Sequence, residues 1–177
     1  MTATETTVGR EEGVAADRAD IDLIVCTIGR PAALTRLLES IEAGTSPRRV
    51  SVILVDQSGD DSVATALSGL RLSFPVRRLT SPRGLSAGRN LGLEHSTAPF
   101  VAFPDDDCWY DASTIDDALQ LIEAVAVDGV SGLQATEAGV SSGLRWPDEA
   151  QAGDRQNFFR TAISSGVFLR ASAVRAV

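Results

Sequence analysis

Three consecutive carboxylates, Asp105 to Asp107, follow the short apolar run Phe100–Phe103. Folding alone gives little reason for three acids at the end of a buried strand, because like charges so close together repel each other and raise each other's pKa. A bound cation relieves that repulsion, and hard cations such as Mg²⁺ and Mn²⁺ prefer carboxylate and phosphate oxygens. We interpret the run as a candidate metal–phosphate site. The alternative is a solvated acidic turn that caps the next helix.

The residues on both sides of these acids alternate between strand patterns and helix patterns. The expected strands are short, apolar and rich in β-branched residues, whereas the expected helices repeat apolar residues every three or four positions. Strands joined by a single helix are parallel, so the fold class is α/β. We expect strands at residues 21–26, 50–55, 76–79, 100–103, 129–135 and 163–169, and helices at about 31–44, 60–70, 86–95 and 113–126.

Two details of the expected helices are specific enough to test. Gly88 and Gly92 weaken the third helix by about 1 kcal/mol each relative to alanine, which predicts close approach of another backbone or of a ligand. The run Ser113 to Asp116 resembles a capping box with Asp in place of Glu at the start of the fourth helix. That helix is expected to turn Ile115, Leu119, Ile122 and Ala126 inward.

Polar residues follow several of these strands, at the edge where open parallel sheets bind their ligands. Asp56 is suited to bonding a ribose hydroxyl or a base edge, and Arg83 and Arg89 are suited to facing phosphate. The plainer alternatives are that Asp56 only ends its strand and that both arginines are surface charges. The full set at this edge is Thr27, Arg30, Asp56, Arg83, Arg89, Asn90, Asp105, Asp106 and Asp107.

Composition narrows the class of protein. A net charge of −8 argues against a general nucleic-acid binder, which would carry a basic face. Cys26 and Cys108 form no CxxC pair, so we expect neither a disulfide framework nor a zinc site, and a reducing, cytoplasmic setting fits best. No apolar run reaches the length of a membrane span, which leaves only surface association with a membrane. We expect a disordered tail at residues 1–19 and a single domain at 20–177.

The order of these motifs resembles the family 2 glycosyltransferases, which have the GT-A fold. Thr27-Ile28-Gly29-Arg30 stands where the family has a Thr-Tyr-Asn-Arg-like loop, and Val55 to Gly59 stands where it has a Val-Asp-Asp-Gly-Ser-like run. Ala87 to Gly92 is similar to its Ala-Arg-Asn-x-Gly segment, and Asp105 to Asp107 to its Asp-x-Asp metal motif. The resemblance implies a GT-A-like, Rossmann-like α/β/α sandwich with a mainly parallel central sheet.

The resemblance also implies a chemistry. The expected reaction is inverting transfer of a sugar from a UDP-, GDP- or dTDP-linked donor to a saccharide or lipid-linked acceptor, in cell-wall or exopolysaccharide biosynthesis. Asp105 and Asp107 match the ligands of Mg²⁺ or Mn²⁺, and Asp106 is the variable middle position. Asp56 matches the base-binding acid. The donor-contacting positions are Thr27, Arg30, Arg83, Arg89, Asn90 and, between the two metal ligands, Asp106.

Two departures from the family pattern bear on function. Ile28 and Gly29 replace the usual aromatic residue and Asn, which leaves base recognition open. The family's general base usually lies in a Gly-Phe-Asp-Glu-like loop after the last strand, and no such loop follows Ser164–Arg170. We therefore expect a truncated chain and leave the catalytic base unassigned, since the loop acids Asp148, Glu149 and Asp154 are weak candidates. The alternative function is a non-catalytic nucleotide-sugar-binding module or an inactive remnant.

Aromatic residues are open to two interpretations each. Trp109 and Tyr110 either pack in the core or shield the metal site. Trp146, Phe158 and Phe159 either line an acceptor pocket or anchor their loop. Two other α/β classes fit less well, because the first loop is neither the Gly-x-Gly-x-x-Gly of a dinucleotide-binding enzyme nor the acidic pair of a phosphoacceptor domain.

Overall fold

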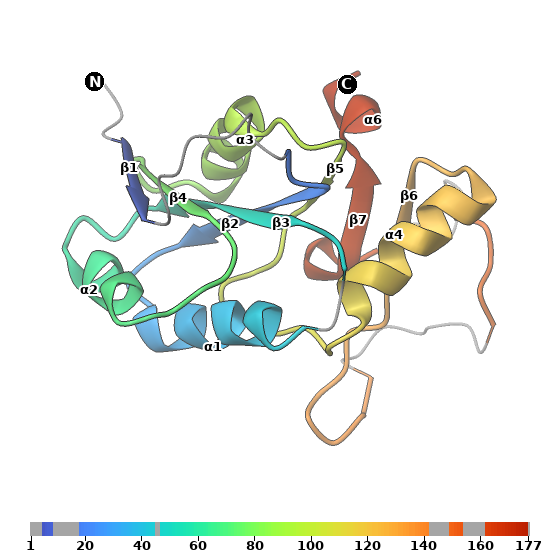
Figure 1. The fold of residues 1–177 in the computed structure, drawn as a ribbon, viewed down its shortest axis with the longest axis horizontal. Coiled ribbons are helices and arrows are strands. Elements are labelled where there is room, and N and C mark those ends of the chain that lie inside the picture. The colour runs from blue at the N-terminus through green and yellow to red at the C-terminus, as the bar shows by residue number, and fades with distance from the viewer. Residues whose placement is uncertain (1–4, 9–17, 45–46, 142–148, 154–161, 177) are drawn as a thin grey trace.

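A single seven-stranded sheet organises the protein (Figure 1). The computed structural model describes residues 5–8, 18–44, 47–141, 149–153 and 162–176. Along the sheet the strands follow the order β1-β4-β3-β2-β5-β7-β6. The four central strands are parallel: β4 (Val76–Thr80), β3 (Val50–Asp56), β2 (Ile21–Thr27) and β5 (Phe100–Ala102).

Antiparallel strands complete the sheet on both sides. β1 (Glu5–Val8) pairs with β4, while β7 (Val167–Arg170) pairs with β5 and β6 (Gly129–Ser131) pairs with β7. β6 is shorter than the strand expected at residues 129–135. A short 3₁₀ turn, η1 (Ser164–Gly166), forms where the first half of the strand at 163–169 is expected.

Helices cover both faces of the sheet, which confirms the α/β/α sandwich. α1 (Pro31–Glu42), α2 (Ser62–Ser68) and α4 (Thr114–Val125) lie on one face, and α3 (Leu85–His95) and α6 (Ala171–Arg175) lie on the other (Figure 1). Alternate side chains of β2 point to opposite faces of the sheet and therefore belong to two separate hydrophobic cores. Leu23 and Val25 join the first, with Leu34 of α1, whereas Ile24 joins the second, against Leu91 of α3.

Gly88 and Gly92 let α3 lie close against β2, but the groups that approach them differ from the backbone or ligand that the sequence predicts. A Cβ at Gly92 would come within 2.3 Å of Ile24 Cγ2, and one at Gly88 within 2.9 Å of Cys26 Sγ. The close approach is therefore made by strand side chains, and neither another backbone nor a ligand is needed to explain it. This packing fixes how far from the sheet α3 carries Arg89.

Three local predictions differ from the structure. Residues 5–8, inside the expected disordered tail, form β1, because hydrogen bonds to the edge of β4 order them without an apolar pattern. The capping box does not form: the Ser113 hydroxyl donates to Asp117 Oδ2 at 2.7 Å, and Asp116 pairs with Arg48. Ala126 is exposed in a left-handed conformation at the end of α4.

No helix among the described residues has both the length and the apolar character needed to cross a bilayer.

Candidate functional site

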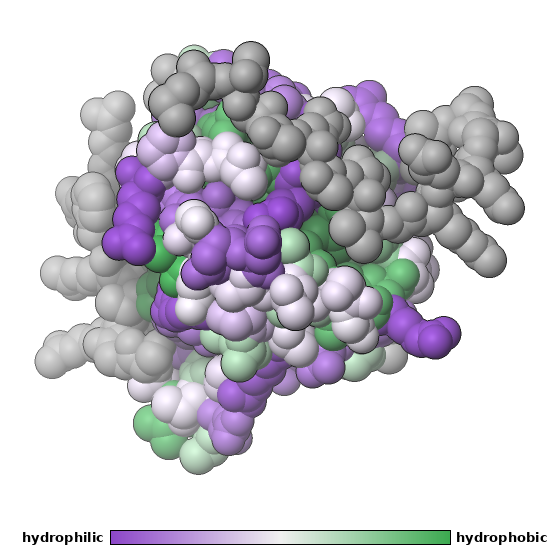
Figure 2. Space-filling view, turned by 90° about the vertical axis from the view of Figure 1, so that its left-hand side faces the viewer, coloured by the Kyte–Doolittle hydropathy of each residue, from purple (hydrophilic) through white to green (hydrophobic). Residues whose placement is uncertain are grey.

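The carboxyl ends of the central strands meet at one edge of the sheet. Gln57 N donates to Thr27 O at 2.9 Å, and Ser81 N donates to Asp56 O at 3.1 Å, so the ends of β2, β3 and β4 stay in step. Asp105 forms an isolated parallel bridge with Cys26, which brings the acidic run back beside the end of β2. Figure 2 faces the side on which α2 and the start of α1 lie, and many of the side chains across its middle are hydrophilic.

Asp106 lies at the centre of the site and is fully buried, with 0% of its surface exposed. Thr27 Oγ1 donates to Asp106 Oδ2 at 2.5 Å, and Arg30 donates to both oxygens of Asp106. The resemblance to family 2 predicts that Asp106 contacts the donor. In the structure Asp106 ties the acidic run to the loop after β2, and Thr27 and Arg30 are its partners.

Asp105 and Asp107 flank this buried acid and are partly exposed. Arg89 Nη2 donates to Asp105 Oδ1 at 2.9 Å, and Arg30 Nη1 donates to Asp107 Oδ2 at 2.5 Å. Burial raises the pKa of Asp105, nearby Arg89 opposes the shift, and Asp107 and Asp106 add to it. Arg30 also loses water on burial, but Asp106 and Asp107 outweigh that effect and raise its pKa.

Asp56 forms a second, neighbouring pair. Its carboxylate is 3% exposed, and Oδ2 accepts from Arg78 Nε at 2.9 Å and Nη2 at 2.7 Å. Its other oxygen, Oδ1, accepts from Ser58 N at 2.9 Å. The predicted base or ribose contact through Asp56 would therefore have to be made beside two existing partners.

Gln57 holds the loop that leads into α3. Its side-chain amide donates to Ser81 Oγ at 2.9 Å, Pro82 O at 2.6 Å and Gly84 O at 3.2 Å. Arg83 and Asn90, both predicted to contact the donor, are exposed beside this loop and on α3. The structure thus brings six predicted residues together in one network of ion pairs and hydrogen bonds. The six are Thr27, Arg30, Arg89, Asp105, Asp106 and Asp107. Asp56 belongs to a separate pair with Arg78. Among the contacts of the described residues, Arg83 and Asn90 belong neither to the network nor to that pair.

The donor set suits a divalent cation that takes few protein ligands. Among the described residues, hydrogen bonds occupy one oxygen of Asp105 and one of Asp107, which leaves a second oxygen on each. No group of three or more His, Cys, Asp or Glu side chains in the described ranges is placed to hold a metal. Mg²⁺ and similar cations are commonly held by one or two carboxylates together with phosphate oxygens and water, so these two residues fit.

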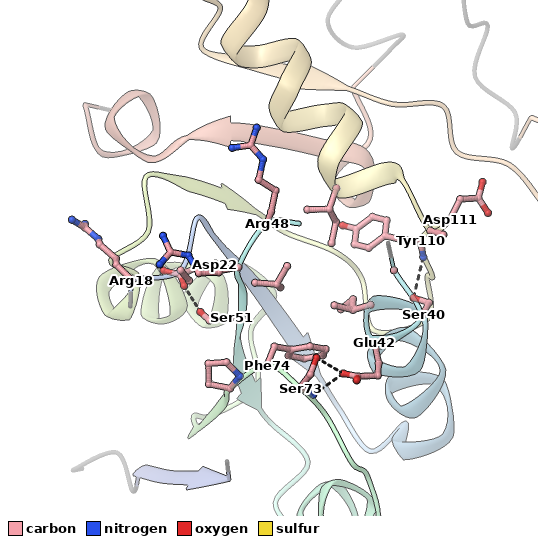
Figure 3. Close-up of a pocket in the computed structure, with 18 of the residues that line it drawn as sticks. Arg18, Asp22, Ser40, Glu42, Arg48, Ser51, Ser73, Phe74, Tyr110 and Asp111 are labelled. Carbon is pink, nitrogen blue, oxygen red and sulfur yellow. Dashed lines mark hydrogen bonds between the residues drawn. The ribbon is translucent and has the colours of Figure 1, made fainter. Parts of the chain in front are cut away.

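A cavity of about 760 Å³ lies at the opposite edge of the sheet, where β2 and β3 begin (Figure 3). Its polar side chains bond to one another: Ser51 donates to Asp22, and Ser73 Oγ donates to Glu42 Oε2 at 3.1 Å. None of the predicted site residues lines it. The cavity and the acidic run are therefore separate features of the molecule.

Residues 22–170 match the family described as Glycosyl transferase family 2. The chain belongs to this family. Succinoglycan biosynthesis protein ExoM of Rhizobium meliloti (strain 1021) is 37% identical over 92 residues, which are 49% of this chain and 29% of ExoM. This family 2 chain thus spans less than a third of the length of that relative.

Solved structures share the fold of this family 2 chain. S. aureus TarS 1-349 superposes with a TM-score of 0.70 at 20% identity, covering 89% of this chain and 48% of that one. TarS 1-349 in complex with UDP-GlcNAc gives a TM-score of 0.67 at 20% identity, covering 89% and 47%. The mannosyltransferase PcManGT from Pyrobaculum calidifontis, in complex with GDP-Man and Mn²⁺, gives 0.57 at 23% identity, covering 68% and 37%. The GT-A-like fold expected from the sequence is confirmed.

Sequence reasoning missed three partners of the predicted residues. Arg78 pairs with Asp56, Gln57 organises the loop before α3, and Ser164 Oγ lies 3.2 Å from Arg89 Nη2. The consecutive arginines at 77 and 78 in a short central strand were a usable signal, because a strand buried on both faces has to pair such charges. Glu149 is exposed, whereas Trp146, Asp148, Asp154, Phe158 and Phe159 lie outside the described residues.

Proposed function

We propose that this family 2 domain binds a nucleotide-diphosphate sugar at the carboxyl edge of its sheet and transfers the sugar, with inversion, to an acceptor hydroxyl. The observation that carries the proposal is the network in which Asp105, Asp106 and Asp107 meet Arg30 and Arg89 at that edge. It combines hard oxygen ligands with two cations suited to phosphate. The relatives bound to UDP-GlcNAc and to GDP-Man and Mn²⁺ support this class of donor.

Each part of the network has a task in this proposal. Asp106 anchors the acidic run, so that Asp105 and Asp107 hold Mg²⁺ or Mn²⁺ with their remaining oxygens. When bound, the metal neutralises charge on the leaving diphosphate. Arg89 and the exposed Arg83 lie on the same side and draw the diphosphate in by charge.

Asp56 is proposed to recognise the ribose or the base through Oδ1, since its Oδ2 is held by Arg78. Transfer also needs a base within hydrogen-bond reach of the acceptor hydroxyl, and the proposal assigns none. The two free cysteines fit the reducing cytoplasm in which we place the reaction. The name of ExoM supports an acceptor in exopolysaccharide synthesis, which is a saccharide or a lipid-linked saccharide.

Calorimetric titration tests the donor site directly. UDP, GDP and dTDP are each titrated into the protein with and without Mn²⁺, and the measurement is repeated on Asp107→Ala and on Asp61→Ala. Asp61 is exposed and makes no side-chain capping bond, so its variant is a matched control for removing one acid. We expect one nucleotide to bind in the presence of Mn²⁺, and to bind at least about tenfold more weakly to Asp107→Ala alone.

Failure of all three nucleotides to bind the folded protein would overturn the proposal. Metal-dependent binding without turnover of UDP-GlcNAc or GDP-Man, in either hydrolysis or transfer, would favour the non-catalytic binding module instead.

A further inference from the structure

Trp109 is a large aromatic side chain that is not packed in the core. It is 36% exposed, whereas the adjacent Tyr110 packs its ring 5.7 Å from that of Phe168. Trp109 follows Asp107 by two residues, so their Cα atoms are at most about 7 Å apart. An indole of this size at the surface, next to a candidate catalytic centre, calls for an explanation that packing does not give.

The ring is held in place from outside the core. The guanidinium carbon of Arg36, on α1, lies 3.5 Å from the centroid of the Trp109 ring. Arg36 in turn forms an ion pair with Glu137, in the turn that follows β6. A cation over an exposed ring is worth about 0.5–1 kcal/mol, so this contact sets the orientation of the ring more than it stabilises the fold.

The turn that carries Glu137 is itself ordered against the acidic run. An isolated bridge joins Ala135 and Ser141, and Thr136 N donates to Val140 O at 2.9 Å. Cys108 immediately precedes Trp109, and its Sγ lies 3.7 Å from Gln134 Nε2. Two segments far from Trp109 in the sequence therefore meet next to it: α1, through Arg36, and residues 134–141, through their bonds to Arg36 and Cys108.

We propose that Trp109 is the platform on which the acceptor saccharide stacks. A sugar ring has an apolar face of C–H groups and a rim of hydroxyls, and the platform offers both complements. Arg36 covers one face of the indole, so the sugar stacks against the part of the ring that remains open. The charged groups of Arg36 and Glu137 at its rim are donors and acceptors for hydroxyls. The inference rests on the proposed function, because it places the acceptor next to the donor that Asp105 and Asp107 are proposed to bind.

Other exposed apolar residues do not share these features. Leu121, on the outer face of α4, is 45% exposed and carries no stacked cation among the contacts of the described residues. It resembles the scattered apolar side chains that most protein surfaces contain. Leu121→Ala is therefore a matched control for truncating an exposed apolar side chain.

The sequence offers a built-in probe, since the chain contains only two tryptophans. In Trp146→Phe, Trp109 is the only tryptophan, and its fluorescence reports stacking. Maltotriose, cellotriose, mannotriose and N,N′,N″-triacetylchitotriose are titrated with and without UDP and Mn²⁺. We expect at least one trisaccharide to change the emission in a saturable way.

Saturation-transfer NMR measures the same binding without using the indole. Trp109→Ala is expected to weaken it at least about tenfold, Trp109→Phe less, and Leu121→Ala by less than about twofold. If Trp109→Ala does not fold, the loss in Trp109→Phe relative to Leu121→Ala decides. Nucleotide binding, measured in the same samples, is expected to stay unchanged in both Trp109 variants.

The inference is overturned if no trisaccharide binds the wild type. It is also overturned if binding survives within about twofold in Trp109→Ala, or in Trp109→Phe where that variant decides. Loss of nucleotide binding by the wild type would count against the proposed function alone, because trisaccharide binding is measured without nucleotide as well.

Discussion

A buried acid lies near each end of β2, and the two acids are held in opposite ways. Near its start, Asp22 is 3% exposed and accepts from Ser96 Oγ at 2.8 Å, Thr97 N at 2.8 Å, Ala98 N at 2.9 Å and the Ser51 hydroxyl. Every one of these donors is neutral. At the other end of the strand, the acids of the run 105–107 are met by arginines.

This difference separates a structural acid from the acids that we propose bind the donor and its metal. Asp22 is saturated by the fold itself, so its own carboxylate is not free for a ligand in the cavity of Figure 3. Asp107 and Arg30 are each about half exposed, at 52%, and such pairs contribute little stability. Asp107 can therefore exchange Arg30 for a metal at small cost to folding, whereas Arg30 has to stay with the buried Asp106.

The largest expected effect is on the structural acid. Asp22→Asn places an amide group among four donors, so we expect a loss of about 3 kcal/mol in the free energy of unfolding. Urea denaturation measures it, with Asp61→Asn as the exposed control. A loss below about 1 kcal/mol would contradict the assignment of Asp22 to the fold.

Disrupting the pair of Asp56 and Arg78 is expected to have an intermediate effect on stability, because the pair is buried but lies at the edge where the donor is proposed to bind. Arg78→Met leaves the Asp56 carboxylate without its charged partner, and we expect a loss of about 2 kcal/mol. Adding Asp56→Asn should recover part of this loss, so a double-mutant cycle is expected to give a coupling of about 1–2 kcal/mol. Additive effects would mean that the pair contributes nothing as a unit.

A small effect on stability is expected at the functional edge itself. Asp107→Asn removes a half-exposed ion pair, so the free energy of unfolding should change by less than about 0.5 kcal/mol. The same urea measurement tests this. A loss as large as that of Asp22→Asn would erase the distinction between the two edges.

The smallest expected effect concerns the reactivity of a cysteine thiol rather than the stability of the fold. Burial raises the pKa of Cys26, at the end of β2, to about 11. A raised thiol pKa keeps the group protonated up to that pH, so at pH 8 only about 0.1% is thiolate. Alkylation of Cys26 by iodoacetamide at pH 8, followed by peptide mass spectrometry, should be far slower in the folded protein than in urea. Equal rates would show that water reaches the interior of this edge.

Local sequence patterns were enough to predict most of the architecture. The apolar strands and the helix stripe of Leu34, Leu37, Leu38 and Ile41 determine where elements lie, since burial of those side chains is what stabilises them. The parallel connections then bring the predicted residues to one edge. β1 escaped prediction because hydrogen bonds to a neighbouring strand order it without an apolar pattern.

The detailed pairing within the site could not be predicted. Thr27 and Asp106 are separated by 79 positions, and no local pattern states which of three adjacent acids turns inward. The choice depends on the register between β2 and the segment after β5, which only the folded chain fixes. Likewise, Ser113 and Asp116 have the right spacing for a capping box, but Arg48 and Asp117 compete for them.

β1 has a consequence for anyone who shortens this chain. It covers the outer side of β4, whose backbone groups would otherwise face water in a row. An uncovered strand of that kind is a template for pairing with another molecule. Removing the residues of β1 would therefore expose this side of β4 and promote self-association. In the folded chain, β1 prevents that pairing by occupying the side of β4 itself.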